Sequence, residues 1–170
     1  MKIVVYSSKP YDKQALCRVF DAEWEILYLE VPLGLDTVAY AQDAEVVSAF
    51  VNDRLDAPVL EALAKCGTKL IALRCAGFNN VDILVAKKLG IRVMRVPAYS
   101  PYAVAEHTVG LMLALNRKLY KAYNRVREGN FALNGMLGFD MHGKTVGIIG
   151  AGRTGRLVGK MLKAFGCHVV

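Results

Sequence analysis

Three glycines near the end of the sequence, Gly150, Gly152 and Gly155, have the spacing G-x-G-x-x-G. The apolar residues 145–149 lead into them, and residues 153–165 continue at once with a helical pattern. A strand, a glycine-rich turn and a helix in this order are typical of the turn that holds the pyrophosphate of a dinucleotide. The alternative is a glycine-rich turn that binds nothing, and the flanking strand and helix favour the first interpretation.

Each glycine of this turn has a separate physical role. Gly150 allows the tight change of direction from strand to helix, Gly152 lets the pyrophosphate approach the backbone, and Gly155 lets helix and strand pack closely. The N–H groups at the start of the helix then face the phosphate charges. Arg153 and Thr154 lie at that helix start, where they are placed to add contacts.

A second group of candidate binding residues follows the buried strand expected at residues 70–74. Ligands of open parallel sheets bind at the carboxyl ends of the strands, and Ala76 and Gly77 lie just beyond this end. We expect their backbone N–H groups to be exposed and to suit a small carboxylate. We also expect Asn79 or Asn80 to cap the next helix.

Two tyrosines follow the last strand of the first half. Tyr99 and Tyr102 either line a ligand pocket or pack at a junction between domains, and the spacing leaves both interpretations open. Glu106 and His107 are adjacent, but neighbours on a helix point about 100° apart and do not face each other as an acid–base pair. We expect these two residues to be buried and hydrogen-bonded in a structural role.

Short apolar strands and helical stretches alternate in the region that must position these residues. Strands are expected at residues 2–6, 25–29, 45–50, 70–74 and 91–96. Helices are expected at residues 11–20, between a cap at Asp56 and a stop at Gly67, and at residues 81–89. Strands separated by helices of this length predict an α/β fold with a parallel sheet covered on both faces.

The pattern changes near residue 99, which divides the sequence into residues 1–99 and 100–170. Ser100 and Pro101 are typical of a helix start, with serine as the N-cap. Residues 102–120 are apolar nearly all round, which predicts one buried helix between two domains or against a second subunit. We therefore expect a homo-oligomer that assembles through the helical region of residues 100–130.

The net charge of +7 raises the question of a nucleic-acid partner. Part of the excess lies in one basic run, which we expect on the solvated face of a single helix: Arg117, Lys118, Lys121, Arg125 and Arg127. Aromatic and basic residues are not interleaved in the manner that stacks single-stranded bases. We therefore expect no nucleic-acid partner.

Composition also bears on the core, on membrane association and on the redox state of the cysteines. Hydrophobic residues make up 54% of the chain, which suits a well-buried core. No apolar run reaches the length of a membrane span, so no membrane association is expected. We expect no metal site. The four cysteines form no C-x-x-C pair and are expected to be buried free thiols in a reducing cytoplasm: Cys17, Cys66, Cys75 and Cys167.

Three stretches resemble the NAD-dependent D-isomer-specific 2-hydroxyacid dehydrogenases, and among them the D-lactate dehydrogenases. They read R-C-A-G-F-N-N-V-D from residue 74, V-P-A-Y-S-P-Y-A-V-A-E-H-T-V-G-L-M-L-A-L-N-R from residue 96, and G-K-T-V-G-I-I-G-A-G-R-T-G from residue 143. The resemblance covers essentially the whole chain. It implies a flavodoxin-like parallel-sheet substrate domain over residues 1–99, followed by an interdomain helix and the start of a Rossmann NAD-binding domain over residues 100–170.

The resemblance also implies roles for individual residues. Three match positions of the substrate site, the first two in the loop that holds the carboxylate: Ala76, Gly77 and Tyr99. Four more match cofactor contacts, two near the nicotinamide and two at the pyrophosphate: Val104, Thr108, Arg153 and Thr154. The implied reaction is the reduction of pyruvate to D-lactate by a cytoplasmic enzyme, with NAD as the cofactor.

The catalytic arginine, glutamate and histidine of that family fall beyond Val170 in this resemblance. His107, His142 and His168 do not match the catalytic histidine, so no catalytic residue is expected in this chain. The chain is expected to be an incomplete N-terminal part and inactive alone. A different class remains open, because the C-terminal-binding-protein corepressors resemble these enzymes and use NAD(H) largely to control assembly. The stretches around Tyr99 and Asn79 favour the lactate group.

Overall fold

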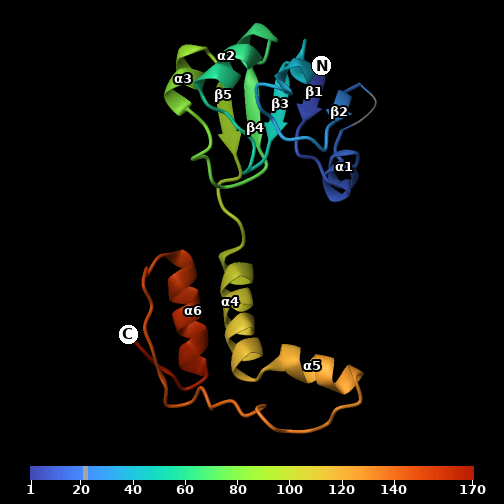
Figure 1. Ribbon diagram of the computed structural model, residues 1–170. Helices are drawn as coiled ribbons and strands as arrows, with labels where there is room; N and C mark the ends of the chain where they lie inside the picture. The colour runs from blue at the N-terminus through green and yellow to red at the C-terminus, as the bar shows by residue number, and fades with distance from the viewer. Residues whose placement is uncertain (21–22) are drawn as a thin grey trace. The chain divides into compact units, whose positions relative to one another are not determined.

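The structure is a computed structural model that describes residues 1–20 and 23–170 of the chain. The chain divides into two compact units, Met1–Tyr99 and Ser100–Val170. Figure 1 shows their helices and strands in chain order.

The first unit is built around one parallel sheet of five strands (Figure 1). Its strands are β1 (Lys2–Val5), β2 (Glu25–Tyr28), β3 (Val46–Ala49), β4 (Leu70–Leu73) and β5 (Arg92–Arg95). Its helices are α1 (Pro10–Leu16), the short 3-10 helix η1 (Val38–Ala41), α2 (Ala57–Lys65) and α3 (Ile83–Lys88). The strands lie in the order β2-β1-β3-β4-β5, and every neighbouring pair is parallel. This is the flavodoxin-like order, so the predicted α/β class is confirmed.

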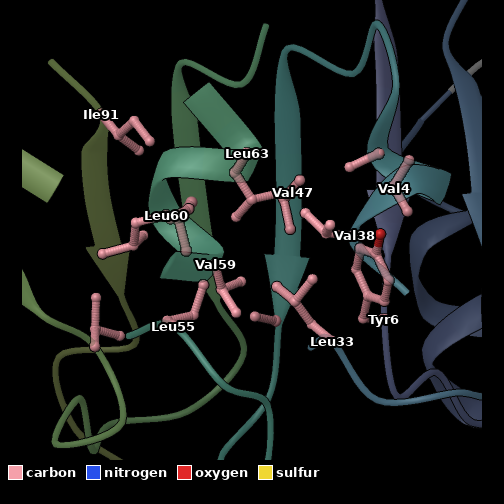
Figure 2. Close-up of a cluster of buried hydrophobic side chains, with 14 of the residues drawn as sticks. Val4, Tyr6, Leu33, Val38, Val47, Leu55, Val59, Leu60, Leu63 and Ile91 are labelled. Atoms are coloured by element: carbon pink, nitrogen blue, oxygen red, sulfur yellow. The ribbon is translucent and has the colours of Figure 1, made fainter. Parts of the chain in front are cut away.

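The core of the first unit lies where α2 covers the sheet (Figure 2). Leu60 and Leu63 of α2 are fully buried, as are Val47 of β3 and Tyr6 beyond the end of β1. The Tyr6 hydroxyl is satisfied inside this core because it donates to the carbonyl oxygen of Thr37 at 2.9 Å. Each buried leucine stabilises the fold by about 1.5–3 kcal/mol relative to an exposed one.

Side-chain caps begin the two helices that flank β4. The Asp56 carboxylate caps α2, as the sequence predicts. The cap of α3 is Asp82, whose carboxylate accepts the Val85 N–H at 3.0 Å. The prediction that Asn79 or Asn80 would cap this helix is therefore wrong. The Asn80 side-chain amide instead donates to the backbone carbonyl oxygens of Phe50 and Asp53.

The second unit contains three helices (Figure 1), together with a small two-stranded sheet. Its elements are α4 (Pro101–Asn116), α5 (Leu119–Arg127), β6 (Thr145–Val146), α6 (Arg153–Ala164) and β7 (His168–Val169). Ser100 caps α4 as predicted, because its hydroxyl accepts the Ala103 N–H at 3.3 Å. Strands β6 and β7 pair in parallel, and α4 packs against α6 around the buried Val109 and Leu162.

The single helix predicted for residues 102–120 is interrupted. Lys118 adopts a left-handed backbone conformation, with φ of 53°, and separates α4 from α5. The basic run is consequently divided between the end of α4 and α5, and does not lie on one helix. Within the described chain Leu111 and Leu115 are 51% and 65% exposed, so burial of this region against a second domain or subunit stays a prediction.

Two further predictions, one about Glu106 and His107 and one about the cysteines, need correction. Glu106 and His107 are exposed on α4, so neither has the buried structural role expected of it. Cys17 is exposed and Cys66 is half-buried, whereas Cys75 and Cys167 are buried, and all four are free thiols.

No helix among residues 1–20 and 23–170 is long and apolar enough to cross a membrane. The same residues contain no group of three or more side chains suited to hold a metal ion.

Candidate functional site

Strand β4 ends at Leu73, and Arg74 follows it. Residues 75–78 come next, at the carboxyl end of this strand, and are called here the 75–78 loop. The Ala76 N–H donates to the hydroxyl oxygen of Tyr99 at 3.0 Å. Two of the residues predicted at the substrate site are thus in direct contact. The expectation that both N–H groups would be open to a carboxylate is wrong for Ala76, whose N–H is taken by Tyr99, whereas the Gly77 N–H has no partner among the described residues. Because the hydroxyl oxygen accepts from Ala76, the O–H hydrogen of Tyr99 remains to be donated to another group.

The guanidinium group of Arg95 bonds to a backbone carbonyl oxygen of the same loop. Nη1 of Arg95, the last residue of β5, donates to the carbonyl oxygen of Ala76 at 3.1 Å. The same nitrogen lies 3.3 Å from the Val96 carbonyl oxygen and 3.1 Å from that of Pro97. The guanidinium carbon also lies 5.3 Å from the centre of the Phe78 ring, a cation–π distance. Arg95 therefore joins the 75–78 loop to the segment that leads to Tyr99.

The buried thiol of Cys75 completes the framework of the loop. Burial raises the pKa of this thiol, with Asp53 adding to the effect and Arg74 opposing it. Cys75 therefore remains protonated at neutral pH, and its Sγ donates to the Gly77 carbonyl oxygen at 3.2 Å. The Cys75 carbonyl oxygen accepts the Val96 N–H at 3.2 Å. This thiol is a structural hydrogen-bond donor and not an ionised nucleophile.

Arg74 occupies the point where the strand order reverses, between β1 and β3. In open parallel sheets this is the usual place for a ligand. Here the guanidinium bonds to the backbone at both strand ends, with Nη2 2.8 Å from the Tyr6 carbonyl oxygen and Nη1 3.2 Å from that of Ser48. Its Nε lies 3.3 Å from a carboxylate oxygen of Asp12. The positive charge of Arg74 is used inside the protein, so the 75–78 loop is the more open position for an anion.

A buried carboxylate, that of Asp53, fixes the segment after β3, which Asn80 contacts two residues beyond the 75–78 loop. Asp53 is only 1% exposed, and its oxygens accept the Ser7 hydroxyl at 2.7 Å and the Leu33 N–H at 2.8 Å. The Asn80 side-chain amide donates to the carbonyl oxygens of Asp53 and Phe50, at 2.9 and 3.2 Å. The end of the 75–78 loop is therefore fixed to the segment after β3.

The glycine turn, residues 150–155, belongs to the second unit. Gly150 has a φ of +99°, a region that L side chains rarely adopt, so glycine is required for this change of direction. A Cβ added at Gly155 would clash with the Gly150 carbonyl oxygen, so helix and turn are in close contact. Gly152 is the N-cap of α6, and a Cβ built on it meets no atom within 4 Å. The space in front of the α6 N–H groups is thus open.

The other residues predicted at the cofactor site lie in the same unit. Arg153 is exposed at the first position of α6, and Thr154 follows it half-buried. Val104 and Thr108 lie one turn apart on α4, and the Thr108 hydroxyl donates to the Val104 carbonyl oxygen at 2.8 Å. Because α4 packs against α6, these four residues share one unit with the glycine turn. Their roles toward a cofactor stay predictions.

Sequence reasoning missed Arg74 and Arg95. Each stands at the end of a strand, and the β4–β5 register pairs Leu73 with Arg95. A basic residue at the end of a strand, next to a loop of small residues, was the signal available in the sequence. The contacts of such a residue depend on which strand lies next to it, and the sequence alone does not show which strands are neighbours.

Comparison with known proteins decides the family. The family model for "D-isomer specific 2-hydroxyacid dehydrogenase, catalytic domain" matches residues 3–164. The chain belongs to this family. The curated relative "2-hydroxyacid dehydrogenase homolog 1" of Schizosaccharomyces pombe is 57% identical over 172 residues, which cover all of this chain and 52% of that protein. The chain spans about half the length of the curated relatives it matches.

Solved structures agree with this assignment. The apo-structure of D-lactate dehydrogenase from Escherichia coli is 50% identical, with a TM-score of 0.88 over 98% of this chain and 54% of that one. The pyruvate reductase of Chlamydomonas reinhardtii is 46% identical, with a TM-score of 0.89 over 99% of this chain and 50% of that one. D-lactate dehydrogenase from Aquifex aeolicus, solved with NAD and lactic acid, is 31% identical, with a TM-score of 0.77 over 98% and 50%.

Proposed function

We propose that the protein is an NAD-dependent dehydrogenase that interconverts small 2-keto acids and D-2-hydroxy acids, with pyruvate and D-lactate as its preferred pair. The observation that carries this proposal is the arrangement of donors beyond β4 in a chain of this family. The Gly77 N–H has no hydrogen-bond partner among the described residues, and it follows directly on the Ala76 N–H that contacts the Tyr99 hydroxyl. The names of the relatives support the same pair of compounds.

The proposed substrate site holds the keto acid by its carboxylate. One carboxylate oxygen accepts the Gly77 N–H, and the other accepts the O–H hydrogen of Tyr99. Two donors spaced along a fixed loop suit a small planar anion, and they leave the carbonyl carbon at C2 free for reaction. The positive guanidinium of Arg95, bonded to the next carbonyl oxygen, raises the electrostatic potential at this loop.

The proposed cofactor site is the glycine turn. Its fit to a dinucleotide is supported by the open space at Gly152 and by the N–H groups at the start of α6, where the helix dipole favours a phosphate. Gly150, Gly152 and Gly155 would form the turn, and Arg153 and Thr154 would flank the pyrophosphate. Val104 and Thr108 would lie near the nicotinamide. When bound, NADH supplies the hydride that adds to C2 of the keto acid.

Copies of the protein are proposed to associate through residues 100–130. The support is a group of exposed apolar side chains on α4 and α5: Leu111, Leu115, Leu119, Tyr120, Tyr123 and Val126. Contiguous apolar surface of this kind marks interaction sites in soluble proteins.

The test uses the protein expressed from its complete gene. Purified protein is mixed with NADH and pyruvate, NADH loss is followed by absorbance, and the product is resolved as D- or L-lactate. We expect D-lactate, and light scattering on the same sample should report an oligomer. Tyr99→Phe should raise the KM for pyruvate about tenfold and leave NADH affinity within about twofold, because it removes one carboxylate donor. Absence of keto-acid reduction, or an L-product, would overturn the proposed function.

A further inference from the structure

Every backbone carbonyl oxygen of the 75–78 loop accepts a hydrogen bond, and one of its N–H groups donates one. The Cys75 carbonyl oxygen accepts the Val96 N–H, and the Ala76 N–H donates to Tyr99. The Ala76 carbonyl oxygen accepts from Arg95, and the Gly77 carbonyl oxygen accepts from the Cys75 thiol. In the part of the chain that the structure describes, the Gly77 N–H has no partner, and the same holds for the N–H groups of Cys75 and Phe78.

The held carbonyl and the free N–H belong to the same peptide unit. The peptide that joins Ala76 to Gly77 is planar and trans, as no cis bond occurs among the described residues. In a planar trans peptide, the C=O and the N–H point in opposite directions. A donor that fixes the Ala76 carbonyl oxygen therefore also fixes the direction in which the Gly77 N–H points.

We propose that Arg95 is a positioning residue that aims the Gly77 N–H at the substrate carboxylate. This inference rests on the proposed function, since it assigns Arg95 a task in the same substrate site. Arg95 does not touch the substrate in this proposal. It acts through the Ala76–Gly77 peptide, whose carbonyl oxygen it holds at 3.1 Å.

Two features suit Arg95 to this task. Its Nη1 also lies within 3.3 Å of the Val96 and Pro97 carbonyl oxygens, so the loop is held to the strand exit that carries Tyr99. The Arg95 side chain thereby fixes the positions of both proposed carboxylate donors, the Gly77 N–H and the Tyr99 hydroxyl, relative to each other. In addition, a cationic donor on a carbonyl oxygen polarises that peptide, and hydrogen bonds in chains strengthen one another. The Gly77 N–H consequently becomes a better donor.

The planar guanidinium is needed for this arrangement. It lies over the Phe78 ring and shares its Nη1 among three carbonyl oxygens, whereas a lysine ammonium is a compact charge on a flexible stem. Arg95→Lys should therefore recover only part of what Arg95→Met loses. Arg92 provides the matched control, because it lies two residues earlier on β5, is exposed, and has no side-chain bond to the 75–78 loop among the described residues.

The experiment compares Arg95→Met, Arg95→Lys and Arg92→Met in the protein expressed from its complete gene. We expect Arg95→Met to raise the KM for pyruvate about tenfold with kcat changed less than about threefold, since a non-reacting part of the substrate is affected. Binding of oxamate, an unreactive isostere of pyruvate, to the protein–NADH complex should weaken by a similar factor. Arg95→Lys should fall between Arg95→Met and the unchanged protein, and Arg92→Met should match the unchanged protein.

NADH affinity and melting temperature separate positioning from a general structural role. Both should stay near their original values in Arg95→Met. If substrate binding, NADH binding and melting temperature all fell together, or if Arg95→Met kept the original KM, the positioning role would be overturned. These results differ from failure of the proposed function, in which the unchanged protein itself would neither bind oxamate nor reduce a keto acid.

Discussion

The 75–78 loop and the glycine turn both present backbone N–H groups, but they are built in opposite ways. In the loop, the side chains of Cys75, Arg95 and Tyr99 hold successive peptide units. Among residues 1–20 and 23–170, no side chain is hydrogen-bonded to the backbone of the turn. The turn owes its shape to glycines that allow a left-handed φ and a close backbone contact. A single added side chain should therefore disrupt the turn, whereas the loop should lose its contacts one at a time.

The strands that precede the 75–78 loop and the glycine turn also differ in length and in burial. The loop follows β4, an internal strand of the five-stranded sheet, and Ile71 of that strand is fully buried. In this chain, which spans about half the length of its relatives, the turn follows β6, a strand of two residues, and Ile149 just before it is exposed. Fixed side chains on a packed sheet tolerate partial loss, because the remaining contacts still hold the backbone.

The largest effect should come from Gly155→Val. The added Cβ would clash with the Gly150 carbonyl oxygen, which is backbone and has no alternative rotamer to adopt. The start of α6 must then shift away from the turn, and the N–H groups lose their alignment. We expect NADH affinity, measured by fluorescence titration of the protein expressed from its complete gene, to fall at least about 100-fold, or about 2.7 kcal/mol.

Gly147→Ala is the control for that experiment. Gly147 lies close to the turn in the chain, and a Cβ built on it meets no atom within 4 Å. Its NADH affinity should stay close to that of the unchanged protein. Near-normal NADH binding by Gly155→Val would show that the turn does not depend on its glycines in the way proposed.

An intermediate effect is expected for Gly152→Val. The new side chain meets no protein atom within 4 Å of its Cβ, so the melting temperature should fall only slightly, because valine is a poorer N-cap than glycine. It would occupy the space assigned to the pyrophosphate, and NADH affinity should fall at least about tenfold, or about 1.4 kcal/mol. Gly110→Ala on α4, also without a close neighbour, should leave NADH affinity unchanged and raise the melting temperature slightly, because alanine favours a helix interior more than glycine. Unaltered NADH affinity in Gly152→Val would remove the glycine turn from the cofactor site.

The contrast between the two regions also explains what the sequence could predict. The glycine turn was readable because its determinants are local: an apolar run, three glycines at fixed spacing and a helix. The strands of the first unit and the caps at Asp56 and Ser100 were predicted for the same reason. Periodicity and capping residues act over a few positions, and the structure repeats the five strands with boundaries shifted by one residue, whereas the helix expected at residues 11–20 already ends at Leu16.

The contacts of the 75–78 loop were not readable, because they depend on which strands are neighbours. The Tyr99 hydroxyl reaches Ala76 across 23 positions of the chain, and the guanidinium of Arg95 reaches the same residue across 19. The interruption at Lys118 has a similar origin. Neither glycine nor proline marks it, and the Lys118 ammonium bonds to the Gly135 carbonyl oxygen at 2.9 Å, a contact made by a later segment.

The smallest effect should come from a helix cap next to the loop. Asp82 begins α3 four residues after Phe78, and its carboxylate accepts the Val85 N–H at 3.0 Å. Asp82→Ala should lower the free energy of unfolding by about 1 kcal/mol, measured by chemical denaturation, as expected for loss of an N-cap. Asp36→Ala, an exposed aspartate outside any helix or strand, should have no measurable effect. The KM for pyruvate should stay within about twofold in Asp82→Ala, since Arg95, Tyr99 and Asn80 still hold the loop. A large rise in KM from loss of this cap alone would mean that the loop depends on one contact, as the glycine turn depends on one close approach, and the contrast between the two regions would not hold.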